Sequence, residues 1–242
     1  RPTLILGKTV MGKGALDEDG NSFERQSSTH GMPLSKAGGS FEKTVTNLGG
    51  DPENPFTIFP EVEEAWKKVL EEKRKKVAEK KEMQATWEKE HPELAEKYKD
   101  FMEGKLPEID FSTIEQKVGS PTRGASGTVL AHLYGKMENL IVASADLSNS
   151  DKTDGFLKKT TSFTHGNFTG SFLQAGVSEL TMAAVASGMA LHGGVIPAIG
   201  TFFVFSDFMK PAVRLAALMC LPVKYVWTHD AFRVGEDGPT HQ

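Results

Sequence analysis

The sequence is short of the residues on which several classes of protein depend. It contains a single cysteine, Cys220, so no disulfide framework can form within one chain. Its 28 lysines and arginines are outweighed by 32 aspartates and glutamates, which gives a net charge of −4. Nucleic-acid-binding proteins usually carry a net basic face, so nucleic acid is not expected as a partner. No secretory signal peptide opens the sequence, and we expect a cytoplasmic protein.

Nucleotide-binding loops and membrane spans are also missing. Residues 12–14 read G-K-G, but neither G-x-x-x-x-G-K-[ST] nor G-x-G-x-x-G is present. The longest apolar stretch, residues 180–205, is interrupted by Ser187, Pro197 and several glycines. A helix followed by a buried strand explains this stretch better than a membrane span does. We therefore expect no membrane partner.

A highly charged segment separates the two ends of the chain. Between residues 61 and 100, 23 of 40 residues are charged, with both signs mixed. Pairs four residues apart, such as Glu64 with Lys68, favour an exposed helix. Pro92 predicts a break after residue 91 and a second short helix at 92–101. We interpret the segment as a helical connector between two domains.

From residue 114 onward, short apolar runs alternate with helical patterns. We expect strands at 140–145, 172–175, 195–203 and 223–227, and helices at 122–137, 178–191 and 206–220. This alternation predicts an α/β fold with a parallel sheet flanked by helices. Cys220 falls in the last helix and is expected to be a small buried hydrophobic residue. A further strand is expected near the start, at residues 3–6.

The last twenty residues place polar side chains after a buried strand. The run 223–227 leads into His229 and Asp230, and a turn-rich loop then carries Asp237 and His241. In open α/β sheets, ligands bind at the carboxyl ends of the strands. These histidines and carboxylates are therefore placed to hold a small polar substrate.

The same segment, T-H-D-A-F-R-V-G-E-D-G-P-T-H-Q, resembles the signature of the transketolase family. Further matches follow in family order in the blocks T-F-F-V-F-S-D-F-M-K-P-A-V-R-L-A-A-L (201–218), A-D-L-S-N-S (145–150), P-T-R (121–123) and H-G-M-P-L (30–34). The resemblance implies a transferase of the pentose phosphate pathway, which moves a two-carbon ketol unit from a ketose phosphate to an aldose phosphate. Dihydroxyacetone synthase, which uses formaldehyde as acceptor, is a related alternative.

The resemblance also implies a division into domains. Residues 1–40 would end a diphosphate-binding domain, residues 41–113 would form a loop and the charged helical connector, and residues 114–242 would form a pyrimidine-binding domain truncated at its C-terminal end. In the family, thiamine diphosphate lies at the subunit interface of a homodimer. The family's Gly-Asp-Gly motif for magnesium and diphosphate is not found here, so the magnesium ligands are expected outside this chain. We expect an incomplete, inactive piece of a longer enzyme; a non-catalytic assembly module is the alternative.

Two catalytic residues follow from the resemblance. Glu179, in G-V-S-E-L-T-M, corresponds to a glutamate that bonds the pyrimidine ring of thiamine diphosphate and promotes general base catalysis. His30 corresponds to a histidine that reaches the cofactor diphosphate and the reaction centre. Without the resemblance, Glu179 would be interpreted as a carboxylate at the positive end of a helix. His30 would be interpreted as a surface-loop histidine.

Other cofactor-binding residues follow in the same way. Phe202, Phe205 and Phe208 correspond to an aromatic pocket for the pyrimidine, where ring stacking suits a flat heterocycle. Asp146 resembles a family residue near the cofactor. Without the resemblance, the three phenylalanines would be ordinary core residues.

Five residues correspond to the family's sugar-phosphate site. Arg123, Ser150 and His229 match residues that bind the phosphate, which requires cationic and hydroxyl donors. Asp237 matches a residue that recognises a sugar hydroxyl, and His241 lies alongside it in the sequence. Each of them alone would be interpreted as a surface polar residue.

Overall fold

The computed structural model describes residues 4–230 and 237–241. The chain forms two compact units, residues 1–83 and 84–242. In the first unit, β1 (Leu16–Asp17) and β2 (Gly39–Ser40) pair antiparallel. Two helices, α1 (Leu34–Ala37) and α2 (Phe41–Asn47), adjoin this short sheet.

The strand expected at residues 3–6 is wrong for its described part. Leu4, Ile5 and Leu6 lie in irregular backbone and are between 86% and 93% exposed. Thr3 lies outside the described residues. An apolar run becomes a strand only where a neighbouring strand takes up its backbone hydrogen bonds. No strand of the described chain pairs with residues 4–6.

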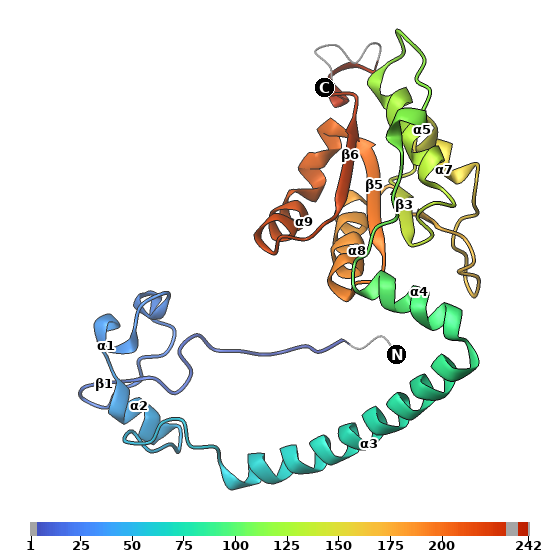
Figure 1. Cartoon of the computed structure of the whole chain (residues 1–242). Coiled ribbons are helices and arrows are strands. Elements are labelled where there is room, and N and C mark those ends of the chain that lie inside the picture. Colours follow the sequence, from blue (N-terminus) through green and yellow to red (C-terminus); the bar gives the residue numbers. More distant parts are fainter. Residues whose placement is uncertain (1–3, 231–236, 242) are drawn as a thin grey trace. The chain divides into compact units, whose positions relative to one another are not determined.

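The charged segment forms the two helices that the sequence predicts. They are α3 (Pro60–Glu90) and α4 (Pro92–Met102) (Figure 1). Pro92 occupies the first turn of α4. No residue of α3 is buried. Ion pairs four residues apart line the helix, among them Lys68 with Glu64 at 3.0 Å. The helix is therefore supported by its own sequence and by solvated charges rather than by a core.

The second unit contains a four-stranded parallel sheet, as expected. Its strands are β3 (Leu140–Ser144), β4 (Phe172–Gln174), β5 (Ile196–Phe202) and β6 (Lys224–Thr228), in the order β4-β3-β5-β6. Its longer helices are α5 (Thr122–Leu133), α8 (Glu179–His192) and α9 (Ser206–Leu218), and its short ones are α6 (Ser148–Asp151) and α7 (Asp154–Leu157). The predicted fold class is confirmed.

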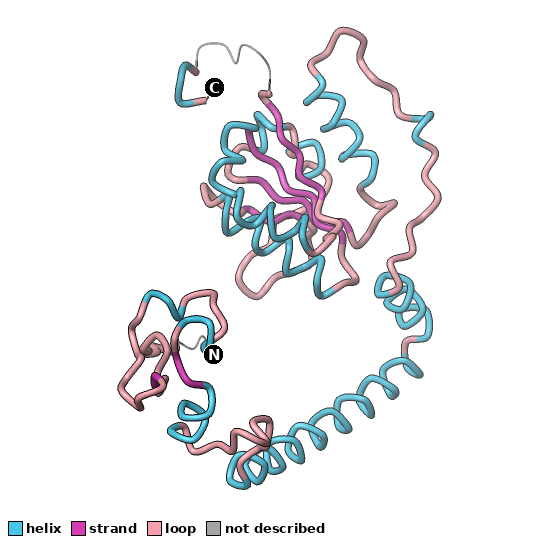
Figure 2. The backbone as a smooth tube through the Cα atoms, turned by 90° about the vertical axis from the view of Figure 1, so that its left-hand side faces the viewer, coloured by secondary structure: helices cyan, strands magenta, loops and turns pink. Residues whose placement is uncertain are grey.

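Helices cover both faces of this sheet (Figures 1 and 2). One core cluster packs α8 and α9 against the strands, through Met182, Ala183, Ala186, Met209, Ala212, Ala143 and Ile199. The other packs α5 and α7 against the opposite face, through Leu130, Phe156, Leu140, Val142, Phe172 and Ala198. Successive strand residues point to opposite faces, so Val142 and Ala143 belong to different clusters. Burial on both faces explains why the strands read as apolar runs.

Two helices end earlier than the sequence suggests. Cys220 is exposed and lies beyond α9, so the expectation of a buried helical cysteine is wrong. Its backbone is left-handed, with φ of 52°, in the turn that leads to β6. Similarly, α5 ends at Leu133, before a turn in which Gly135 has φ of 76°. These ends are set by turn geometry rather than by hydropathy.

The apolar stretch at residues 180–205 is a helix followed by a strand, α8 and then β5, as predicted. Within residues 4–230 and 237–241, no helix has the length and hydropathy required to cross a bilayer.

Phe172 tests the assigned core, because its side chain is fully buried in β4. We expect Phe172→Ala to lower the free energy of unfolding by about 3–5 kcal/mol, since it removes a large ring from a packed interior. Urea unfolding followed by circular dichroism measures this. The control is Phe168→Ala, because Phe168 is 73% exposed; its loss should stay within about 0.5 kcal/mol. Equal losses in the two variants would contradict the core assignment.

Candidate functional site

The carboxyl ends of the parallel strands meet at one edge of the sheet (Figure 1). Ser144 ends β3 and pairs with Gly200 near the end of β5. Phe202 ends β5 and pairs with Thr228 at the end of β6. The loops that follow these strands therefore start side by side, where α/β sheets bind their ligands.

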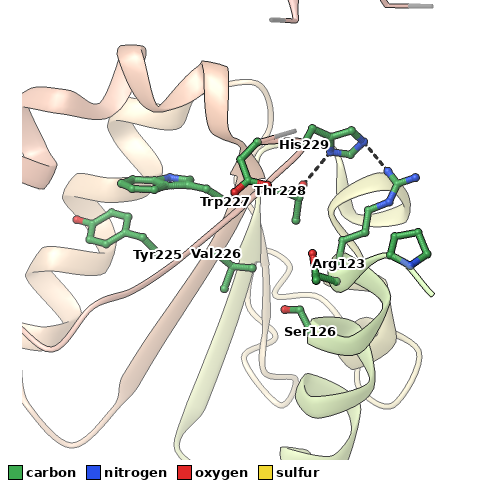
Figure 3. Close-up of a pocket in the computed structure, with 10 residues that line it drawn as sticks. Arg123, Ser126, Tyr225, Val226, Trp227, Thr228 and His229 are labelled. Atoms are coloured by element: carbon green, nitrogen blue, oxygen red, sulfur yellow. Dashed lines mark hydrogen bonds between the residues drawn. The ribbon is translucent and has the colours of Figure 1, made fainter. Parts of the chain in front are cut away.

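The three predicted phosphate-binding residues lie together at this edge. Arg123 is in the first turn of α5, and its Nη1 donates to the backbone carbonyl of Ser150 at 3.3 Å. The same guanidinium contacts Nε2 of His229, which follows β6 directly (Figure 3). A helix N-terminus adds positive partial charge. The arrangement can attract an anion.

The hydrogen bonds of His229 define its tautomer. An arginine can only donate, so Nε2 of His229 accepts from Arg123. The proton of the neutral ring is then on Nδ1, which donates to Oγ1 of Thr228 at 2.9 Å. Burial, and next the positive charge of Arg123, lower the pKa of His229 from its ordinary value of 6.5. The carboxylates of Asp237 and Asp151 oppose this shift.

A cleft of about 580 Å³ opens beside Arg123 and His229 (Figure 3). It is lined by Pro121, Thr122, Arg123, Ser126, Tyr225, Val226, Trp227, Thr228, His229 and Asp230. The hydroxyls of Thr122 and Ser126 were not expected at this site. The one signal in the sequence is helical spacing, because Ser126 lies three residues after Arg123 and so on the same face of α5.

The predicted aromatic residues form one cluster with the two histidines. The ring centroids of Phe202 and His229 are 3.7 Å apart, and those of Phe202 and Phe205 are 5.7 Å apart. Phe205 in turn lies 6.1 Å from Phe208 and 5.3 Å from His241. Phe208 is 63% exposed. The cluster thus extends from the anion-attracting group to an open aromatic surface.

Glu179 begins α8 and is only 6% exposed. It follows β4, so it also lies beyond the carboxyl end of a parallel strand. A carboxylate there favours the positive end of the helix. Its position at a helix start is thus as the sequence predicts, and its catalytic role stays a prediction.

The remaining predicted residues are exposed. Asp146 follows β3 in a left-handed conformation, with φ of 65°. Asp237 is exposed, although its carboxylate acts on the pKa of His229. His30 belongs to the first unit and lies at the end of the 3₁₀ turn Ser27–Thr29. The roles of all three stay predictions.

One buried carboxylate was missed. Asp151 ends α6, is fully buried, and accepts hydrogen bonds from Ser144 and Thr153. Burial raises the pKa of Asp151, and these hydrogen bonds oppose the shift. The sequence offers only a charged residue directly after A-D-L-S-N-S, which is also typical of an exposed turn.

No group of three or more metal-ligating side chains is arranged for a metal ion within the part of the chain that the structure describes.

Comparisons with known proteins first define the class. Residues 1–107 match the family description "Transketolase, thiamine diphosphate binding domain". Residues 119–242 match "Transketolase, pyrimidine binding domain". The parallel sheet thus lies in a region that matches a pyrimidine-binding domain, and it follows a region that matches a thiamine diphosphate-binding domain.

The chain belongs to the transketolase family. It is 40% identical over 247 residues to the transketolase of Halalkalibacterium halodurans. The match covers 100% of this chain and 35% of the relative. The solved transketolase of Leishmania mexicana superposes with a TM-score of 0.72 at 30% identity, over 86% of this chain and 32% of that one. A Pichia stipitis transketolase in complex with sedoheptulose-7-phosphate superposes with a TM-score of 0.70 at 30% identity, over 86% of this chain and 33% of that one. The chain therefore spans about a third of the length of these relatives.

The contact between Arg123 and His229 predicts an unusual titration. We expect His229 to titrate below 6.5 in the folded chain, and Arg123→Gln to raise that pKa by removing the adjacent positive charge. Imidazole NMR signals followed against pH measure both values. Lys210→Gln is the control, because Lys210 pairs with Asp207 at the surface of α9.

The same shift links pH to stability. The folded pKa of His229 lies below the unfolded value, so the unfolded state binds more protons between the two. The contribution of His229 to the free energy of unfolding therefore falls as the pH falls through that window.

In the titration experiment, an unchanged His229 pKa in Arg123→Gln would contradict the assigned contact.

Proposed function

We propose that the complete polypeptide carrying these residues is a transketolase. It would transfer a two-carbon ketol unit from a ketose phosphate to an aldose phosphate, with thiamine diphosphate as cofactor. The observation that carries the proposal is the convergence of an anion-attracting group and an aromatic cluster at one sheet edge. Arg123, Ser150 and His229 supply the first, and Phe202 joins it to the second.

The anion-attracting group suits the phosphate of a sugar phosphate. Arg123 is permanently charged and presents a planar set of donors that matches phosphate oxygens. Thr122 and Ser126, which carry hydroxyls, also line the cleft. Two solved Pichia stipitis transketolases contain sedoheptulose-7-phosphate and fructose-6-phosphate. Asp237 and His241 are proposed to contact the sugar hydroxyls.

The aromatic cluster suits the flat pyrimidine ring of thiamine diphosphate. Phe205 and Phe208 present stacked rings, with 26° between their planes, and Phe208 is open to solvent. When bound, thiamine diphosphate supplies a carbon nucleophile that attacks carbonyl groups. Glu179, buried at the start of α8, would hold a proton against a nitrogen of the pyrimidine ring. Asp146 is proposed to assist in holding the cofactor.

The rest of the site belongs to other parts of the proposed enzyme. His30 would act at the diphosphate and the reaction centre, and magnesium would be held by residues outside this chain. We propose residues 1–40 as the end of the diphosphate-binding domain, 41–113 as the connector and 114–242 as the pyrimidine-binding domain. The two family matches support this order of functions along the chain. A homodimer with the cofactor at the subunit interface completes the proposal.

Glu179→Gln in the complete polypeptide tests the catalytic assignment. We expect kcat at saturating thiamine diphosphate to fall at least about 100-fold, because an amide cannot exchange a proton with the pyrimidine ring. A coupled assay of two-carbon transfer measures this. The control is Glu138→Gln, since Glu138 forms a surface ion pair with Lys97 at 2.9 Å; its kcat should change less than about twofold. Near-normal turnover in Glu179→Gln would remove the role given to Glu179.

A further inference from the structure

The proposed reaction leaves one buried ionisable group at the strand-end edge without a role. Asp151 is fully buried, and so are its bonding partners Ser144 and Thr153. A buried carboxylate is costly unless hydrogen bonds compensate for the lost water. Such a group needs a structural or functional reason to be there.

Three donors compensate for the burial of Asp151. Its Oδ1 accepts from the backbone N–H of Thr153 at 2.8 Å and from Oγ1 of Thr153 at 2.7 Å. Its Oδ2 accepts from Oγ of Ser144 at 2.7 Å. Asp151 therefore fastens the segment after α6 to the last residue of β3.

These bonds fix the turn after β3, residues 145–150, whose last residue contacts Arg123. Oγ of Ser144 also accepts from the backbone N–H of Leu147 at 3.1 Å, so both ends of the turn are tied to the same serine. The backbone N–H of Ser150 donates to Leu147 within the turn at 2.8 Å. The carbonyl of Ser150 in turn accepts from Arg123 at 3.3 Å. Asp151 thus acts on the Arg123 guanidinium through a continuous chain of hydrogen bonds.

The neighbouring strand leaves room for this carboxylate. A Cβ atom at Gly200 of β5 would lie 2.9 Å from Oδ2 of Asp151 and 2.6 Å from Cγ2 of Thr153. Gly200 pairs with Ser144 across the sheet. Any side chain at Gly200 would therefore push Asp151 and Thr153 out of position.

We infer that Asp151 is a positioning residue of the anion-binding group: its bonds to Ser144 and Thr153 hold Ser150 where it orients Arg123 toward a substrate phosphate. The inference rests on the proposed function, because it assumes that this group binds the phosphate of the substrate. Asp151 touches neither substrate nor cofactor and acts only through Ser150 and Arg123.

Two substitutions that both remove the negative charge of Asp151 distinguish a positioning role from an electrostatic one. Asp151→Asn keeps an acceptor oxygen for Thr153 and an amide that can donate to Ser144. Asp151→Ala removes all three bonds. In the complete polypeptide, inorganic phosphate is titrated against the NMR signals of the His229 imidazole. We expect phosphate affinity to fall at least about tenfold in Asp151→Ala and to be retained in Asp151→Asn.

Steady-state kinetics supply a second readout. The KM for a ketose phosphate should rise about tenfold in Asp151→Ala with kcat nearly unchanged. The KM for an unphosphorylated ketose should not move. Asp154→Ala is the matched control, because Asp154 lies three residues further on and bonds Lys158 at 2.6 Å. A general loss of structure would instead change the kinetic constants for the phosphorylated and the unphosphorylated ketose alike.

Equal phosphate affinity in Asp151→Ala and Asp151→Asn would overturn the inference. Failure of the unsubstituted protein to bind phosphate would also overturn it. If Asp151→Ala does not fold, Ser144→Ala decides, because it removes one of the three bonds: weaker phosphate binding supports the inference, and unchanged binding rejects it. Failure of the proposed function is distinguishable. In that case the unchanged protein would bind phosphate but transfer no two-carbon unit.

Discussion

The parallel pairing of β3, β5 and β6 holds together both the core of the second unit and the strand ends that carry the candidate site. Its register places Ser144 opposite Gly200 and Phe202 opposite Thr228. Neighbouring strands take up each other's backbone hydrogen bonds, so a slip of register would be costly. It would also separate the loops that carry the candidate site. Core packing on both faces and ligand recognition at the strand ends are therefore consequences of one hydrogen-bonding pattern.

The candidate site is held by buried polar bonds rather than by loops alone. Asp151 anchors the turn after β3, and Thr228 orients the His229 ring by accepting its Nδ1 proton. Phe202, at the end of β5, stacks against the same ring. Arg123 and His229 are thus held beside the cleft before a phosphate binds. Pre-organisation of this kind lowers the cost of binding.

Much of the fold was predictable from hydropathy, because strands buried on both faces leave short apolar runs that alternate here with helical patterns. The runs at 140–145 and 172–175 are strands to within one residue. The prediction of a strand at 3–6 was wrong for residues 4–6 because a strand needs a neighbouring strand to pair with, and a local apolar pattern does not reveal one. The prediction of a buried helical Cys220 was wrong because a left-handed turn ends α9 before this residue. The strand-end rule located His229, Asp237 and His241, and the other candidate residues were reached through family resemblance. Asp151 was missed because its role arises from contacts between segments.

The complete polypeptide is proposed to transfer a two-carbon unit between sugar phosphates. The most direct measurement supplies it with thiamine diphosphate, magnesium, an aldose phosphate acceptor and a ketose phosphate labelled with ¹³C at its first two carbons. Mass spectrometry of the products then follows the label. We expect an acceptor lengthened by both labelled carbons, and only when thiamine diphosphate is present. Label that stays in the donor under all conditions, or that appears without the cofactor, would contradict it.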